Sequence, residues 1–296
     1  MTVQSTSMHN QLPFTVSQRP ISTNELYSLY MAMDPIEGLR GVFDRLHSFA
    51  ADECNRFFTP DEFGSLMVEE RRRNAHSRFI GFQPVDHPPP LHHHTLYLTS
   101  FITRWLRERC ETYTMMPFIS SRYYALYRRI DMRNGNLDGN TDLSQRQEQL
   151  DRKAQLTKQL FAEEHFPEWI KQFVCHVIED DDAAVPRRFG LAVDLWRTLY
   201  PLMRPNQNPD LVDFGNPQFI RLRYLVIDFV LYSLRLEAEP AQWHWHWPQD
   251  REKIGERTCR NCSTPGISKV VINRQPGNVP IELLERALPP RGTFLG

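Results

Sequence analysis

Residues 217–237 read PQFIRLRYLVIDFVLYSLRLE, and this segment decides the fold class. Pro217 suits the first turn of a helix, and apolar residues then recur at helical spacing on more than one side. A helix that is apolar on several sides is surrounded by other elements, so we expect it at the centre of a bundle. The charges within the run exclude a membrane-spanning helix. One apolar row holds Phe219, Leu222, Val226 and Phe229, and another holds Ile220, Ile227, Leu231 and Leu234.

Helix signals repeat before this segment. Asp34-Pro35 reads as a cap followed by the first helical residue, and Thr59-Pro60-Asp61-Glu62 is a capping box. The turn NGNLDGNTD at 134–142 separates two further helices. The fold class we predict is therefore mostly α, with a multi-helix, bundle-like domain over residues 23–238. Its expected helices span 23–33, 34–57, 59–79, 96–114, 120–132, 143–165, 167–178, 187–203 and 217–237.

The two ends of the chain differ from this domain. Residues 239–296 hold seven of the 22 prolines, and only 269–273 alternates like a strand. We expect an extended N-terminal arm over 1–22 and an irregular, Pro-rich C-terminal arm over 239–296. An arm that cannot bury its own apolar residues needs another surface. The predicted partner-binding residues are Trp243, Trp245, Trp247, Phe294 and Leu295.

The charge balance limits the classes of partner. The 35 Lys and Arg nearly cancel the 36 Asp and Glu, so the net charge is −1 and a global basic field for nucleic acid is absent. Thirty of the 35 basic residues are arginine. Arginine is enriched at protein interfaces, although genomic base composition explains the same bias. The composition therefore favours contacts with proteins over contacts with nucleic acid.

The C-terminal arm contains a candidate zinc site. His244 and His246 are followed, after twelve residues, by Cys259-x-x-Cys262. Two imidazoles and two thiolates suit tetrahedral zinc, and a site closed by four ligands is structural rather than catalytic. The order reverses the usual zinc-finger order, so an aromatic docking strip and an inert CxxC pair stay open as alternatives. A redox CxxC lacks its βαβ frame. No other cofactor is expected.

A second candidate site would bind RNA. Residues 92–133 carry seven arginines against three acids, interleaved with tyrosine and tryptophan. Stacking and phosphate contacts of this kind bind single-stranded RNA. The competing interpretation puts the aromatic rings in the core with the guanidinium heads outside. The candidate RNA contacts are Arg104, Arg107, Arg128 and Arg129.

Motifs for catalysis are missing from the sequence. It contains no GxGxxG, phosphate-binding loop, GxSxG or HExxH pattern. Five cysteines over nearly 300 residues do not form a secreted disulfide framework, and no apolar signal segment opens the chain. Residues 1–24 contain four serines, four threonines and no acid, which partly matches an organellar transit peptide.

We therefore expect a non-catalytic structural or accessory subunit of a large multiprotein assembly, whose arms bind neighbouring subunits. In its make-up the chain resembles supernumerary subunits of mitochondrial energy-converting complexes, so the expected assembly is a respiratory-chain or ATP synthase complex. The alternative is an RNA- or mitoribosome-associated factor, and an enzyme with an unrecognised site comes third. The expected location is mitochondrial, otherwise cytoplasmic, and not secreted. We expect no transmembrane segment, although the chain would sit beside membrane subunits.

Overall fold

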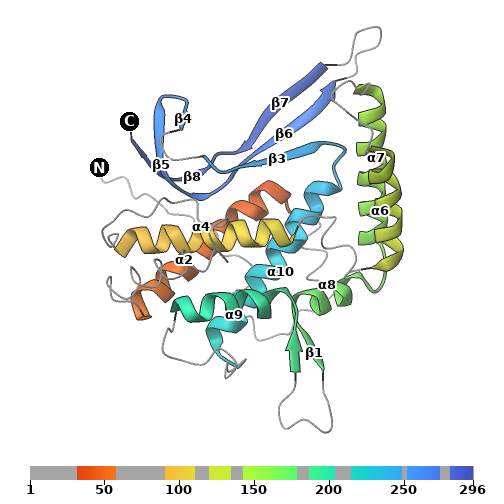
Figure 1. Ribbon diagram of the computed structural model, residues 1–296. Helices are drawn as coiled ribbons and strands as arrows, with labels where there is room; N and C mark the ends of the chain where they lie inside the picture. Colours follow the sequence, from red (N-terminus) through yellow and green to blue (C-terminus); the bar gives the residue numbers. More distant parts are fainter. Residues whose placement is uncertain are drawn as a thin grey trace, which may run out of the picture.

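The computed structural model describes residues 32–57, 91–110, 120–134, 143–178, 187–203, 215–248, 252–273 and 281–295. The predicted N-terminal arm and the helix expected over 59–79 lie outside these residues, as does nearly all of 23–33. The described part is mostly helical, as predicted, with several short strands (Figure 1). Its helices are α2 (Pro35–Phe57), α4 (Leu91–Arg109), α6 (Ser121–Asn134), α7 (Leu143–Phe161), α8 (Phe166–Val174), α9 (Leu191–Met203) and α10 (Pro217–Glu237).

The helix α10 lies at the centre, as its sequence predicts. Asn216 caps it, because its side chain accepts a hydrogen bond of 2.8 Å from the Gln218 amide. More than half of its residues are buried, and it packs against α2, α7, α8 and α9. Figure 1 shows α10 passing through the middle of the helical layer.

The helix α2 also begins where its cap predicts. The Asp34 carboxylate accepts hydrogen bonds from the amides of Ile36 at 2.9 Å and Glu37 at 3.0 Å. These bonds satisfy two of the backbone donors that an α-helix leaves open in its first turn. The start of α2 could therefore be predicted from four residues of local sequence.

Three predicted helices are shorter than expected: the helix predicted over 143–165 ends at Phe161, and two others lose an end to strands. The segments 176–178 and 187–189 form an antiparallel hairpin of β1 (His176–Ile178) and β2 (Arg187–Phe189). The chain leaves helical geometry at Cys175, with φ −155° and ψ 97°, and returns to it after Gly190. The helices predicted over 167–178 and 187–203 were wrong at these ends, because the pairing joins segments that lie apart in sequence.

The C-terminal segment corrects the prediction of an irregular arm over 239–296. Instead of an extended arm, the described residues between 242 and 295 form strands that all pair antiparallel, in the orders β3-β6-β7 and β4-β5-β8. The strand expected over 269–273 is part of β6. The strands are β3 (Gln242–His246), β4 (Lys253–Ile254), β5 (Arg257–Thr264), β6 (Gly266–Asn273), β7 (Ile281–Leu288) and β8 (Arg291–Leu295).

These two three-stranded sheets are halves of one bent meander. The strand β5 continues into β6 through Pro265, and β7 continues into β8 through Pro289 and Pro290. In the first long strand of the meander, Pro248 follows the end of β3. Proline has no N–H to donate, so it interrupts a ladder of hydrogen bonds. Four of the seven prolines that suggested an irregular arm therefore mark the line along which the meander bends.

The meander lies against the helices. The strand β5 packs on α4, β7 contacts α2 and β3 contacts α10, and Figure 1 shows the sheet covering one side of the helical layer. A two-residue turn at Gly255-Glu256 joins β4 to β5, and Gly255 adopts the left-handed φ of +64° that such turns require. In the described part of the chain, no helix combines the length and the apolar character needed to cross a membrane.

Candidate functional site at the junction of helices and sheet

The alternation of β3 separates two kinds of side chain. Successive residues of a strand point to opposite faces, and the sequence of residues 242–247 is QWHWHW. Trp243 and Trp245 are half-buried towards the helices, whereas His244 and His246 are exposed. Trp247, just after the strand, is half-buried as well. We call the three indoles and their contacts the tryptophan seam.

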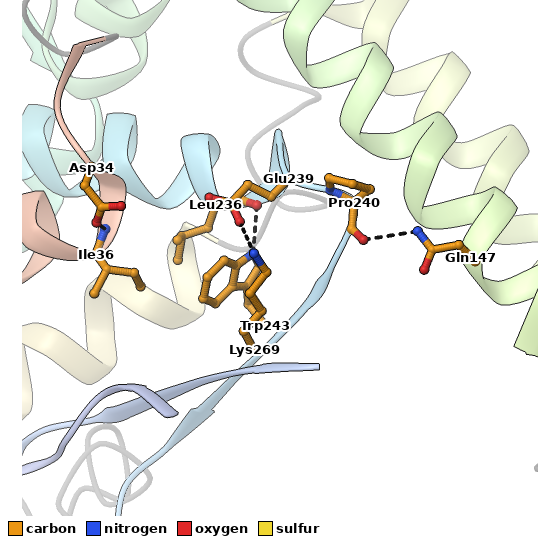
Figure 2. A network of polar contacts seen from close by, with 8 residues as sticks. All are labelled: Asp34, Ile36, Gln147, Leu236, Glu239, Pro240, Trp243 and Lys269. Carbon is orange, nitrogen blue, oxygen red and sulfur yellow. Dashed lines mark hydrogen bonds and ion pairs between the residues drawn. The ribbon is translucent and has the colours of Figure 1, made fainter. Parts of the chain in front are cut away.

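Trp243 fastens the sheet to the end of α10. Its indole N–H donates a hydrogen bond of 2.8 Å to the Leu236 carbonyl in the last turn of that helix (Figure 2). The ammonium of Lys269, on β6, lies 5.4 Å from the centre of the indole and bonds the Glu239 carboxylate at 2.7 Å. A cation held above an indole by a second partner adds attraction to the packing.

Trp245 reaches the main core. Its ring centre lies 6.3 Å from that of Phe43 on α2 and 5.9 Å from that of Phe229 on α10. On its other side, the Arg107 guanidinium of α4 lies 4.9 Å from the indole centre. The aromatic contacts are edge-on or tilted, which the charge distribution of the rings favours. This side chain therefore joins three helices to the sheet.

Trp247 continues the stack. Its indole lies nearly parallel to Trp245, with ring centres 6.3 Å apart, and the Arg104 guanidinium lies 5.3 Å from its centre. Burial lowers the pKa of Arg104 below its ordinary value, although the Cys262 thiol nearby acts in the opposite direction. Two arginines one helical turn apart on α4 thus cover two indoles two residues apart on the sheet.

This arrangement divides the four arginines selected as RNA contacts. Arg104 and Arg107 lie against indoles of this chain, whereas Arg128 and Arg129 are exposed on α6. The residues selected for partner binding are divided too. The three tryptophans contact this chain's own helices, and Phe294 and Leu295 pair through their backbones with Cys259 and Thr258. The structure therefore brings together two of the four predicted RNA contacts and three of the five predicted partner-binding residues.

The two cysteines of the CxxC pair are both buried in β5. Residues three apart on a regular strand point to opposite faces, but the pairing of β5 with β8 shifts by one residue between Cys259 and Asn261. Such a bulge allows both thiols to lie on the buried side. Burial, with the neighbouring Cys259 thiol, raises the pKa of Cys262 to about 12, and its thiol donates to the Thr264 carbonyl at 3.0 Å. Neither cysteine forms a disulfide.

The four predicted zinc ligands do not converge. The thiols of Cys259 and Cys262 are buried, whereas the imidazoles of His244 and His246 lie on the exposed side of β3. The His246 ring contacts the Glu252 carboxylate at 2.7 Å instead. Among the described residues, no group of three or more His, Cys, Asp and Glu side chains is placed to hold a metal ion.

The side of the sheet opposite the tryptophans forms a second surface, which we call the outer face. Strand pairing sets its members in two rows. Leu284 is 68% exposed, the larger value of the two exposed large hydrophobic residues in the described part, and His244 is also exposed. Sequence reasoning missed Leu284, because residues 281–288 do not alternate cleanly. The rows are Gln242, Val270 and Leu284, and His244 and Ser268.

One ion pair elsewhere in the structure has its acid buried inside the helical core. Asp228 of α10 is 3% exposed and pairs with Arg45 of α2 at 2.5 Å. Burial raises the pKa of Asp228 well above its ordinary value, and burial, with the Asp228 charge beside it, raises the pKa of Tyr232 to about 12. Shifted pKa values often mark active sites, but burial between packed helices accounts for these. The sequence shows Asp228 only as a break in an apolar run.

Comparison with known proteins adds no relative. No family model, no curated protein and no solved structure matches this chain. The chain's own geometry must therefore support any functional assignment.

Proposed function

We propose that this chain is a non-catalytic accessory subunit of a larger protein assembly and that it docks through the outer face of the C-terminal sheet. The observation that carries the proposal is the contrast between the two sides of the sheet. Trp243, Trp245 and Trp247 hold one side of the sheet against the helices, while on the other side Leu284 of β7 is 68% exposed and His244 of β3 is exposed as well. An exposed face that has apolar residues among polar ones, on a sheet whose other side is packed against helices, suits contact with a protein.

The location of the ionisable groups supports a non-catalytic role. A catalytic acid, base or nucleophile must reach a substrate. Among the groups with raised pKa values, Asp228, Cys110 and Cys262 are buried, whereas Asp194 of α9 is exposed. Their pKa values rise mainly because burial penalises the charged form. The fold therefore gives these groups a structural explanation without a reaction.

For the assembly itself we favour a mitochondrial respiratory-chain or ATP synthase complex. The net charge of −1 is unlike that of a ribosomal protein, which needs a basic surface to bind RNA. The seam also occupies Arg104 and Arg107, which reduces the basic surface left for RNA. An RNA- or mitoribosome-associated factor is the alternative that the following experiment separates.

The test is the native mass of the tagged full-length chain in a gentle extract of its own cells, with mass spectrometry of what migrates with it. We expect migration far above 35.0 kDa with a fixed set of membrane-complex subunits. The outer-face variant His244→Glu/Val270→Lys should lose those subunits. The control Gln155→Lys, at an exposed position of α7, should keep them.

Two results would contradict the proposal. A wild-type chain that migrates as a free monomer has no assembly to serve. Migration with ribosomal RNA and proteins would favour the RNA-associated factor. The melting temperature of each variant separates a lost contact from a lost fold.

A further inference from the structure

The strand β7 has one edge without a described partner. It pairs with β6 on one side, and among the described strands none pairs with its other side. Leu284, in the middle of this strand, is 68% exposed. An edge strand offers a row of backbone donors and acceptors, and an exposed apolar residue on it favours pairing with another strand.

The order of charges along β7 indicates which strand fits. Glu282, Leu284 and Arg286 occupy alternate positions and so belong to one face of the strand. An antiparallel copy of the same strand, related by a twofold axis at Leu284, sets Leu284 opposite Leu284. Each Glu282 then stands opposite Arg286 of the second copy. Cross-strand pairs of opposite charge stabilise a sheet.

We propose that β7 pairs with β7 of a second copy of this chain in this register, forming a twofold-symmetric dimer. The β3-β6-β7 sheet of one copy and the same sheet of the second copy then become one six-stranded sheet. A twofold interface uses the same patch on both copies, and a strand that complements itself supplies such a patch. The dimer needs only this chain, so it stands independently of the assembly proposed above.

The same charges disfavour the neighbouring register. Moving the twofold axis by one residue, to Glu285, sets Glu285 opposite Glu285, and like charges directly opposite are destabilising. The irregularity in the β6–β7 ladder falls between Arg286 and Leu288, beyond the stretch that carries the pairing. The stretch from Glu282 to Arg286, which is symmetric about Leu284, is therefore regular.

The test uses charge reversal and the mass of the full-length protein by light scattering or sedimentation. The wild type should form a dimer of twice 35.0 kDa at rising concentration. Glu282→Arg alone and Arg286→Glu alone each create two like-charge pairs, so each dimer should dissociate about tenfold more readily. An equimolar mixture of the two single variants restores both opposite-charge pairs and should recover the dimer, and so should the double variant.

The exposed Lys253 on β4 supplies the matched control, because Lys253→Glu reverses a charge on a different strand and should leave the dimer unchanged. Circular dichroism and the melting temperature confirm that each variant is folded. A wild-type chain that stays monomeric up to its highest soluble concentration overturns the proposal. A dimer that does not respond to either reversal, or a mixture that fails to recover, overturns it as well.

Discussion

At the scale of single residues, the fold depends on a few side chains of α2 and α10. Gly38 of α2 faces the Tyr232 ring so closely that a Cβ added there would collide with ring carbons. One turn further, a Cβ on Gly41 would meet nothing within 4 Å. The close approach of α10 therefore requires a glycine at position 38, whereas nothing in the surroundings of position 41 requires one.

The first prediction concerns this pair of glycines. Gly38→Ala should lower the free energy of unfolding by about 2 kcal/mol, because overpacking against Tyr232 exceeds the gain in helix propensity. Gly41→Ala should raise it by about 1 kcal/mol, because alanine favours the helix and the space is open. Urea unfolding of both variants checks the signs. Equal effects would mean that α2 and α10 are not in contact at Gly38.

The second prediction concerns the Arg45–Asp228 ion pair. Arg45→Met should lower the free energy of unfolding by about 3 kcal/mol at pH 8, because it leaves a buried carboxylate without its guanidinium. The double variant Arg45→Met/Asp228→Leu should recover most of that loss, because no buried charge remains.

The pH dependence follows from the direction of the Asp228 pKa. Burial raises that pKa in the folded state, so folding favours the protonated acid, and stability falls as pH rises through the window above the ordinary pKa of aspartate. The deficit of Arg45→Met should therefore be smaller at pH 5 than at pH 8 in urea unfolding. A deficit that is the same at both values would show that Asp228 keeps one protonation state throughout.

At the scale of elements, α4 and β3 are joined by cations stacked on indoles. Arg107 and Arg104 lie over Trp245 and Trp247, and Trp245 in turn contacts Phe43 and Phe229. On a helix face exposed to solvent, the guanidinium groups of Arg104 and Arg107 would contact water instead of these indoles. Their place in the seam makes them part of the contact that holds the sheet.

The third prediction separates seam arginines from surface arginines. Arg107→Met should lower the free energy of unfolding by about 1 kcal/mol, because the stack on Trp245 is lost while the apolar stem is kept. Arg128→Met, at an exposed position of α6, is the control and should change it by less than about 0.5 kcal/mol. Thermal unfolding followed by tryptophan fluorescence measures both. A reversed order of the two effects would contradict the stacked seam.

The helices could be predicted because their signals are local. Asp34 caps α2 and Asn216 precedes Pro217 at the start of α10, and the apolar rows of α10 lie within one segment. The meander could not be predicted in the same way. The strand β5, RTCRNCST, has no alternation, and its burial depends on α4, more than 140 residues earlier in the chain. Its bulge is set by pairing with β8, which no local pattern reveals.

The candidate site was predicted only in its parts. The segment QWHWHW alternates between two faces in β3, but a strand was not predicted there, and the sequence does not say which face meets the helices. Arg104 and Trp247 were each selected, for RNA and for a partner, because both residue types favour contact surfaces. Their contact with each other arises from tertiary packing. Leu284 lacks a local signal, since its exposure depends on which strand forms the edge of the sheet.

At the scale of the whole molecule, the C-terminal segment is part of the folded body. The main chain of β5 accepts a hydrogen bond of 3.1 Å from Thr103 of α4, at Ser263, and Arg291 of β8 pairs with Asp44 of α2. Together with the tryptophan seam, these contacts attach the meander to the helices at several points along its length. The sheet therefore covers apolar residues that the helices alone would expose.

The fourth prediction follows from this coverage. Removal of residues 239–296 should uncover Phe43 and Phe229, so the remaining chain should bind apolar dyes and lose its cooperative unfolding transition. Chemical unfolding and dye binding of the shortened chain measure this. A shortened chain with the unfolding midpoint of the full protein would mean that the sheet adds nothing to the helical body.

Hydrogen–deuterium exchange of the purified full-length chain tests most directly the claim that strands β3 to β8 form a sheet packed against the helices, with an exposed outer face. We expect the amides that pair β5 and β6 with their neighbours to exchange as slowly as those of α10, because the meander opens only when the body unfolds. Exchange of residues 257–273 at the rate of an unstructured chain would contradict the account. The segment would then be a free arm, and the outer face would not exist before binding.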